Sequence, residues 1–435
     1  MLLDVMLALG LLLSTASQLR PAGAKIGPGE ACLAIWVFVM LAREAGRLGP
    51  PLTPALCRLL AFWIVFAVAL CLGTMTGYLL GNIHDRALFL HDIIAYGVVA
   101  AISCFLAVEP GAGQRVHRVC WLLVTIGAAW LALQAAHGWG LLHLGNFDPW
   151  EWDRFRGFSE NSNQLALFCA VLVLLSLHLV NVVGRPGGRI IAMGCMIVAI
   201  VVGRLTQSNA FLFVLLAAMP ILIALKLRAW LLSRERTLSF RSASAWIVVL
   251  ALPLVAAYVV PLAASFATEP GVVVKEMMRG GTTTEVDEAA SQRFDLWNEA
   301  VRRGVGSGML GLGPGPHLEI PLSLDARRRH SENAPWHTSL PQLSVAPNFE
   351  AHNTVLDLFV QGGLLAVSAL VWLLVSTLVQ TGRARLDELA TLICVVALFS
   401  IFHMIMRHPI VWFAITLCVV MAADTGRAAR MRAWS

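Results

Sequence analysis

The chain has 435 residues, of which 58% are hydrophobic and 13% are charged. Soluble globular domains carry about 25% charged residues, and disordered chains are poor in hydrophobic ones. The composition therefore excludes an ordinary soluble enzyme and a disordered protein, and it predicts an all-α protein that crosses a membrane many times. The net charge of +6 does not indicate a nucleic-acid partner, since the basic residues lie in short segments between apolar runs.

Twelve apolar runs are long enough, or almost long enough, to cross a membrane as helices. They cover residues 1–19, 29–42, 56–81, 91–108, 118–137, 162–183, 188–203, 208–232, 244–266, 354–380, 388–406 and 409–424. The first run has no basic residue before it, so we expect a membrane span there rather than a cleaved signal peptide. The sequence thus predicts nine spans in residues 1–266, a loop domain in residues 267–353, and three spans with a tail in residues 354–435.

The positions of lysine and arginine indicate the orientation of these spans. If the N-terminus is cytoplasmic, the inside segments hold 17 basic residues and the short outside loops hold 7. Basic residues concentrate on the cytoplasmic side of membrane proteins. We therefore expect both termini in the cytoplasm and the long loop, residues 267–353, on the outer face.

The long loop is acidic, with eleven acidic and eight basic residues, and its length is typical of a functional loop rather than a connection. In its first half, Phe294, Trp297 and Val301 recur at a spacing that predicts an amphipathic helix. A glycine-rich turn follows at residues 311–317. Residues 321–348 show no period, which predicts an irregular segment.

Ionisable groups at the edge of a membrane are costly, so they are candidates for function. His352 lies where the long loop meets the predicted span at 354–380, and an imidazole can accept a proton near neutral pH. His352 is therefore a candidate for proton transfer. The adjacent Asn353 either orients a substrate or begins the helix, and these two residues alone favour neither interpretation.

Three arginines are predicted to lie on this same outer face: Arg156, Arg204 and Arg293. Each of them alone is better explained as a residue that anchors its segment at the membrane interface. Together they predict a site for a diphosphate, because guanidinium groups stay charged and bind phosphate oxygens in pairs. The polar run at residues 161–164, which includes Asn163, is either a helix cap or a contact to sugar or phosphate.

Other kinds of chemistry lack their motifs in this sequence. It contains no G-x-S-x-G elbow, no G-x-x-x-x-G-K-[ST] phosphate loop, no H-E-x-x-H pair and no D-x-D-like pair in the outer segments. The nine cysteines lie in or beside apolar runs and have no metal-type spacing. We therefore expect a reaction without nucleotide, metal or other cofactor.

Taken in order, the motifs of this chain resemble the O-antigen ligase and polymerase superfamily of bacterial inner-membrane glycosyltransferases. The resemblance covers nearly the whole chain and depends on order and spacing, since no single motif is specific. The start of the chain, LLLSTASQLRPAGAKIGPGE, also resembles the exopolysaccharide-polymerase branch. The matching motifs are R-G-F-x-x-N-x-N-x-x-A (Arg156 to Ala166), R-x-x-x-W (Arg293 to Trp297), G-x-G-x-G (Gly311 to Gly315), H-N-x-x-L (His352 to Leu356) and a glycine pair (Gly362, Gly363).

The resemblance implies a GT-C-like helical fold and metal-independent, inverting transfer of a glycan from an undecaprenyl-diphosphate donor on the periplasmic side. The acceptor is lipid A-core for a ligase, or another lipid-linked repeat unit for a polymerase, and a chain-length regulator protein is a candidate partner. The family's motifs make His352 the base for the acceptor hydroxyl and Arg293 a diphosphate clamp. The expected substrate-binding residues are Arg156, Asn163, Arg204, Asn209, Trp297 and Asn353.

The chain departs from the family pattern after the seventh span. Many members carry T-x-S-R there, whereas this chain has Asn209 in the place of the arginine. We hypothesise that Arg204 supplies the missing charge. The N-terminal resemblance favours a polymerase, and a ligase is the alternative within the family. A transporter of lipid-linked sugars is the alternative of another class, and it is disfavoured because the sequence shows no internal repeat.

Overall fold

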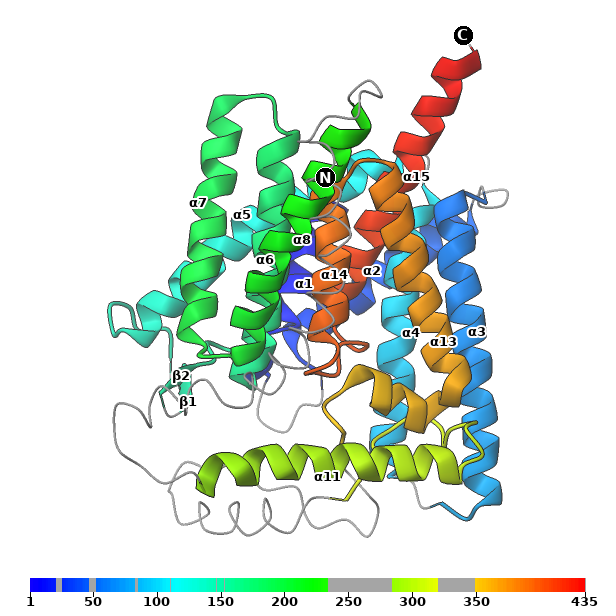
Figure 1. Ribbon diagram of the computed structural model, residues 1–435. Helices are drawn as coiled ribbons and strands as arrows, with labels where there is room; N and C mark the ends of the chain where they lie inside the picture. Colours follow the sequence, from blue (N-terminus) through cyan, green and yellow to red (C-terminus); the bar gives the residue numbers. More distant parts are fainter. Residues whose placement is uncertain are drawn as a thin grey trace.

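The fold is a bundle of long helices, as the composition predicts (Figure 1). The computed structural model describes residues 1–20, 26–46, 52–82, 85–109, 111–145, 147–151, 153–233, 284–319 and 349–434. The α-helices are α1 (Leu2–Leu13), α2 (Pro28–Ala45), α3 (Pro54–Leu79), α4 (Arg86–Val108), α5 (Ala112–Gly138), α6 (Ser162–Val182), α7 (Pro186–Leu205), α8 (Asn209–Ser233), α11 (Thr284–Gly306), α13 (Thr354–Arg383), α14 (Asp387–Phe399) and α15 (Pro409–Trp434). A 3-10 turn, η1 (Ser17–Leu19), and a two-stranded hairpin, β1 (Trp150–Glu151) and β2 (Arg154–Phe155), complete the described elements.

Eight of the described helices are long and apolar enough to cross a membrane: α3 to α8, α13 and the first part of α15. This confirms a multi-pass all-α membrane protein. The count of twelve spans stays a prediction, and the run at 244–266 lies outside the described residues.

Two predicted spans are shorter in the structure than in the sequence pattern. α1 has 12 residues, and its end is closed where the hydroxyls of Ser14 and Thr15 donate to carbonyls of the preceding turn. α14 has 13 residues instead of the predicted 388–406. It ends at Phe399 because the next residues form hydrogen-bonded turns around polar side chains, and these turns lead into α15.

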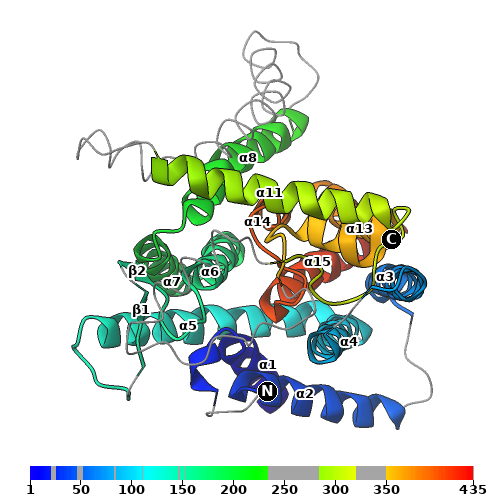
Figure 2. The ribbon, with the colours of Figure 1, turned by 90° about the horizontal axis from the view of Figure 1, so that it is seen from below.

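The centre of the bundle is formed by α6, α14 and α15, whose apolar residues are almost all buried. The outer helix α7 instead exposes a broad apolar face, which includes Ile190, Ile197 and Val201. An exposed apolar face on a spanning helix is what lipid contact requires. Figure 2 shows α7, α8, α2 and α3 at the periphery and α6 and α15 between them.

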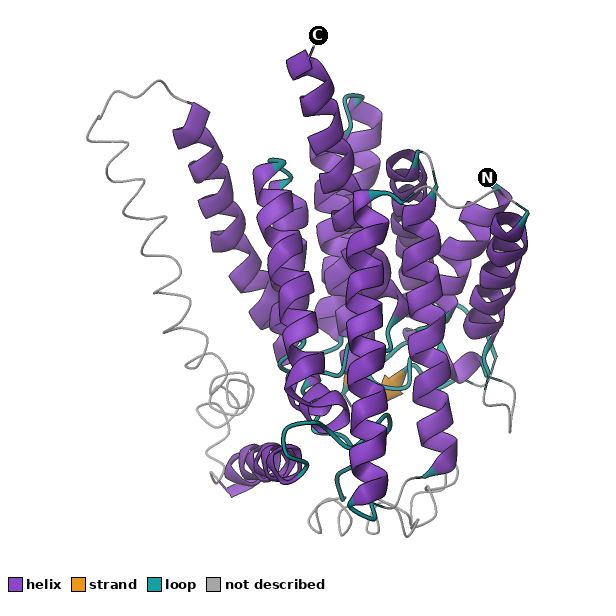
Figure 3. Cartoon of the chain, turned by 90° about the vertical axis from the view of Figure 1, so that its right-hand side faces the viewer, coloured by secondary structure: helices purple, strands orange, loops and turns teal. Residues whose placement is uncertain are grey.

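Both chain termini lie at one end of the bundle, and α11 lies at the other (Figures 1 and 3). The helix α11 runs across the ends of the spanning helices rather than along them. The N-terminal ends of α6, α8 and α13 and the C-terminal end of α7 lie at the same end of the bundle as α11. The predicted site residues therefore gather at one end of the molecule, as the alternation of the spans predicts.

Helix α13 is broken at its glycine pair, where Gly362 and Gly363 leave the helical conformation. The break frees backbone groups, and the loop after α11 binds them. Leu312 and Gly313 donate their N–H groups to the carbonyls of Val360 and Gln361, at 2.7 and 2.8 Å. The glycine-rich turn thus supports the broken helix, because unpaired backbone groups at membrane depth are costly.

Candidate functional site at the α11 end

The loop helix predicted from the sequence is present as α11, but the face that packs inward differs from the predicted one. Leu296 and Ala300 are buried against Leu312, Leu318 and other residues of a small outer core. Phe294 and Val301, predicted to share the packed face, are 59% and 44% exposed. The sequence pattern predicts the helix correctly, but several apolar positions remain on its other side.

His352 lies immediately before α13 and is exposed. Its backbone φ is +51°, in the left-handed region that residues other than glycine seldom adopt. The ring lies edge-on to Phe349 at 5.3 Å and parallel to the His403 ring at 6.5 Å between centroids. Backbone conformations of this kind are found more often at functional sites, which keeps His352 a candidate.

Three backbone groups next to His352 are held by neighbouring side chains. Trp297 of α11 donates its indole N–H to the Ala351 carbonyl at 3.2 Å. Asp357 accepts from the N–H groups of Ala351 at 2.7 Å and Asn353 at 3.2 Å. Trp297 and Ala351 are 54 residues apart in the chain. Their hydrogen bond brings the motif R-x-x-x-W next to the motif H-N-x-x-L.

Asn353 is the N-cap of α13. Its side-chain oxygen accepts from the N–H groups of Val355 and Leu356, at 3.0 and 3.2 Å. The helix-start alternative for Asn353 is thus confirmed. Asn161 likewise caps α6 by accepting from the Gln164 N–H at 2.9 Å, which confirms the capping alternative for the polar run there. Neither capping contact tests a role in substrate binding.

Behind His352 lies a charge cluster that the sequence analysis missed. Arg407, in the turn between α14 and α15, donates to Asp92 of α4 at 2.6 Å and also pairs with Glu350. Burial alone would lower the pKa of Arg407, but the two carboxylates outweigh it and raise this pKa above its usual value. The cluster ties α4, the turn before α15 and the segment before His352 together.

Two further histidines extend from His352 into the protein. The rings of His403 and His408 stack at 5.3 Å between centroids. Burial holds the pKa of His403 well below its usual value and, together with Arg407, lowers the pKa of His408 to about 4. Both are therefore neutral at neutral pH.

A second polar group, the Asn163 cluster, consists of Arg154, Asn163, Thr206 and Ser208. The Asn163 side-chain oxygen accepts from Arg154 Nη2 and from the Ser208 hydroxyl, both at 3.0 Å. Arg154 also donates to the Thr206 carbonyl at 3.3 Å, and burial lowers the pKa of Arg154. The cluster joins the β-hairpin to the α7–α8 turn.

Sequence reasoning chose Arg156, but Arg154 is the arginine that reaches the Asn163 cluster. Arg156 instead donates to the carbonyl oxygen of Asp148 at 3.1 Å and lies 3.5 Å from its carboxylate. The two arginines are two residues apart in the chain. The register of the hairpin, which pairs Arg154 with Glu151, gives them different neighbours. The local sequence carries no signal for that choice.

The remaining predicted residues are placed less centrally. Arg204 is exposed in the last turn of α7, and it continues the lipid-facing line of Ile197 and Val201. Asn209 is exposed at the start of α8. Arg293 lies in α11, one turn before Trp297, and its side chain is outside the described part of the structure. The structure thus joins Trp297, Asn353 and His352 in one group and Asn163 in another.

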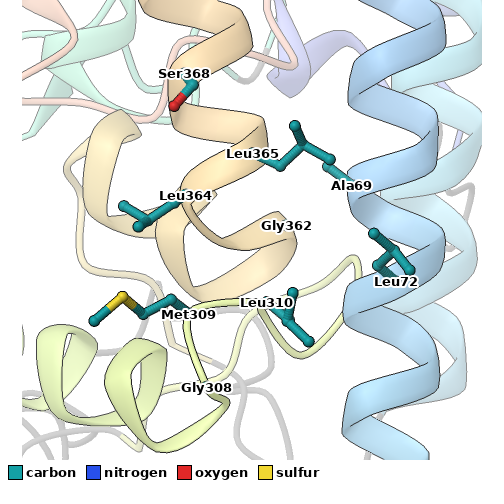
Figure 4. Close-up of a pocket in the computed structure, with 9 residues that line it drawn as sticks. All are labelled: Ala69, Leu72, Gly308, Met309, Leu310, Gly362, Leu364, Leu365 and Ser368. Carbon is teal, nitrogen blue, oxygen red and sulfur yellow. The ribbon is translucent and has the colours of Figure 1, made fainter.

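An apolar cavity of about 430 Å³ opens beside the break in α13 (Figure 4). Several of its lining side chains are partly exposed, among them Leu72, Leu310 and Leu364. The cavity lies between α3, the loop after α11 and α13, and it is lined by Ala69, Leu72, Gly308, Met309, Leu310, Gly362, Leu364, Leu365 and Ser368. Within the described residues, no three His, Cys, Asp or Glu side chains are placed to hold a metal ion.

Comparison with known proteins gives one result. Residues 191–371 match the model of the O-antigen ligase family. No curated protein and no solved structure matches the chain. The matched region runs from α7 to α13 and includes Arg204, α11, the glycine-rich turn and His352. Members of this family are glycosyltransferase-like enzymes that use a lipid-linked glycan donor and a saccharide or lipid acceptor. The match over residues 191–371 supports the O-antigen ligase and polymerase superfamily for this chain.

Proposed function

We propose that this protein transfers a glycan from an undecaprenyl-diphosphate donor to a saccharide hydroxyl at the periplasmic face of the bacterial inner membrane. The observation that carries the proposal is the junction of α11 with the start of α13. There Trp297 binds the peptide group next to an exposed, conformationally fixed His352. A base that is open to the outside and rigidly held suits an acceptor that arrives from the aqueous phase.

In this account His352 removes the proton from the acceptor hydroxyl. The oxygen forms a bond to the anomeric carbon while the bond from that carbon to the diphosphate breaks, and undecaprenyl diphosphate leaves. A single displacement inverts the configuration at the anomeric carbon. The diphosphate is already a good leaving group, so electrostatic stabilisation of its charge takes the place of a covalent intermediate or a metal ion.

Arginines would provide that stabilisation. Arg293, one turn before Trp297 on α11, is our candidate for the diphosphate clamp. Arg156, Asn163, Arg204 and Asn209 remain candidates for donor contacts. To them we add Arg154, because its guanidinium is hydrogen-bonded to the turn that precedes Asn209, where the family pattern has an arginine. Trp297 and Asn353 would act beside His352.

The polyprenyl chain of the donor needs an apolar path from the membrane to this end of the bundle. The cavity between α3 and the break in α13 has an apolar lining and partly exposed walls. Gly362, which lines the cavity, lies ten residues after His352 in the chain, and α13 begins just after His352. We place the first isoprene units there.

A polymerase is our first choice of acceptor chemistry, from the N-terminal resemblance, and a ligase is the second. The test is transfer by the purified protein in nanodiscs, with undecaprenyl-diphosphate oligosaccharide and EDTA present. Longer lipid-linked chains with inverted linkages are expected. Product only on added lipid A-core would assign a ligase. No product with any acceptor in nanodiscs, together with movement of the donor across the bilayer when the protein is placed in vesicles, would contradict the proposal and favour a transporter.

A further inference from the structure

The backbone conformation of His352 requires a cause in the backbone contacts around it, because the ring contacts with Phe349 and His403 involve only the side chain. The residue is exposed, and its φ of +51° is unfavourable for a side chain with a Cβ atom. Such a conformation persists only when surrounding contacts over-determine it. The contacts that do so are made by the backbone groups on either side of the residue.

Asp357 makes the two contacts that enclose His352. Its Oδ1 atom accepts from the N–H of Ala351 at 2.7 Å, and its Oδ2 atom accepts from the N–H of Asn353 at 3.2 Å. The side chain is only 5% exposed, and it projects from the first turn of α13. One rigidly placed carboxylate thus fixes the chain immediately before and immediately after the histidine.

Other contacts in this region hold the helix rather than the histidine. Thr354 donates its N–H to the Ser400 carbonyl at 2.8 Å and its hydroxyl to the His403 carbonyl at 2.6 Å, which joins the start of α13 to the turn after α14. Arg407 pairs with Asp92 and Glu350. These groups set where α13 begins, whereas Asp357 sets the direction of the chain through residue 352.

We propose that Asp357 is a positioning residue for His352: its carboxylate, by accepting both flanking N–H groups, holds the histidine in the left-handed conformation that presents the imidazole to the acceptor. The inference rests on the proposed function, in which His352 is the base. Both carboxylate oxygens are required. An amide at this position has one acceptor oxygen, and its NH2 group faces an N–H donor.

The test is Asp357→Asn in the full-length protein in nanodiscs, studied by glycan-transfer kinetics and by cryo-electron microscopy. The variant should lose about 100-fold in kcat, as expected for a displaced catalytic group, with KM for donor and acceptor within about twofold. Its structure should show residue 352 outside the left-handed region. Asp387→Asn is the matched control, since Asp387 is a buried aspartate in the first turn of α14 at the opposite end of the bundle.

The outcomes separate this inference from the proposed function. An imidazole that stays in place in Asp357→Asn, or a loss expressed in KM rather than kcat, would overturn the positioning role. A displaced imidazole with unchanged kcat would leave the positioning role intact and remove His352 from the reaction. If Asp357→Asn does not fold, Asp357→Ser takes the same two measurements. A serine has one hydroxyl oxygen in the place of two carboxylate oxygens, so an unmoved imidazole with full kcat would again overturn the inference.

Discussion

The charge cluster behind His352 makes a quantitative prediction about stability. In Arg407→Gln, the carboxylates of Asp92 and Glu350 lose the cation that pairs with both. The Asp92 side chain is 1% exposed and that of Glu350 is 17% exposed, so water can compensate little of the loss. Removing one partner of a buried ion pair costs about 3–5 kcal/mol. Because Arg407 is itself 23% exposed, we expect the lower part of that range, about 3 kcal/mol.

The assay is the free energy of unfolding in mixed micelles with increasing denaturing detergent. Arg302→Gln is the control, since Arg302 forms an exposed ion pair with Glu299 and should cost less than about 1 kcal/mol. The triple variant Arg407→Gln, Asp92→Asn, Glu350→Gln should recover most of the loss, because it leaves no unpaired buried charge. A cost for Arg407→Gln no larger than the control, or a triple variant as unstable as the single one, would refute this reasoning.

Three further predictions concern the break in α13, the buried histidines and the Asn163 cluster. Gly363→Ala should destabilise the protein by about 1–3 kcal/mol in the same unfolding assay, because φ is +63° and the new Cβ would lie 2.0 Å from a backbone carbonyl oxygen; Gly194→Ala, in open space on α7, should cost nothing. Burial and the neighbouring cation lower the pKa of His408 from 6.5 to about 4, so the unfolded chain binds a proton in this window that the folded one does not. Thermal stability should therefore fall as pH decreases from about 6.5 to 4, and His408→Gln should flatten this part of the pH profile; an unchanged slope would contradict the assignment. Arg154→Gln should lower the transfer rate about tenfold, and Arg154→Lys should recover only part of it, because lysine keeps the charge but lacks the planar fork that binds Asn163. Full activity of the glutamine variant would remove Arg154 from the site.

Local pattern was sufficient to predict most of the helices and some of their ends. Long apolar runs predict spans, and the capping positions of Asn161 and Asn353 follow from polar residues that precede such runs. The helix α11 follows from the period of its apolar residues. These features depend on neighbours within one or two turns, which the sequence displays directly.

The contacts that define the site join residues far apart in the chain, and no local pattern carries them. Arg407 meets Asp92 across 315 residues, and in the sequence it is a single arginine in a short loop, with no pattern that indicates its partner. The choice of Arg154 over Arg156 depends on the register of a two-residue hairpin. The face of α11 that packs inward depends on the residues that Leu296 contacts. These residues come from the loop after α11 and from α13, so the period of α11 alone does not predict that face.

The central claim is that His352 is the base of a glycan transfer at the outer face. The most direct measurement compares initial transfer rates of His352→Ala and His143→Ala with the wild type, at equal amounts of folded protein. His143 is an exposed histidine near the outer end of α5 and serves as the matched control. We predict that His352→Ala loses at least about 100-fold, in the range of general-base catalysis, while His143→Ala keeps the wild-type rate. Equal rates for the two variants would contradict the account.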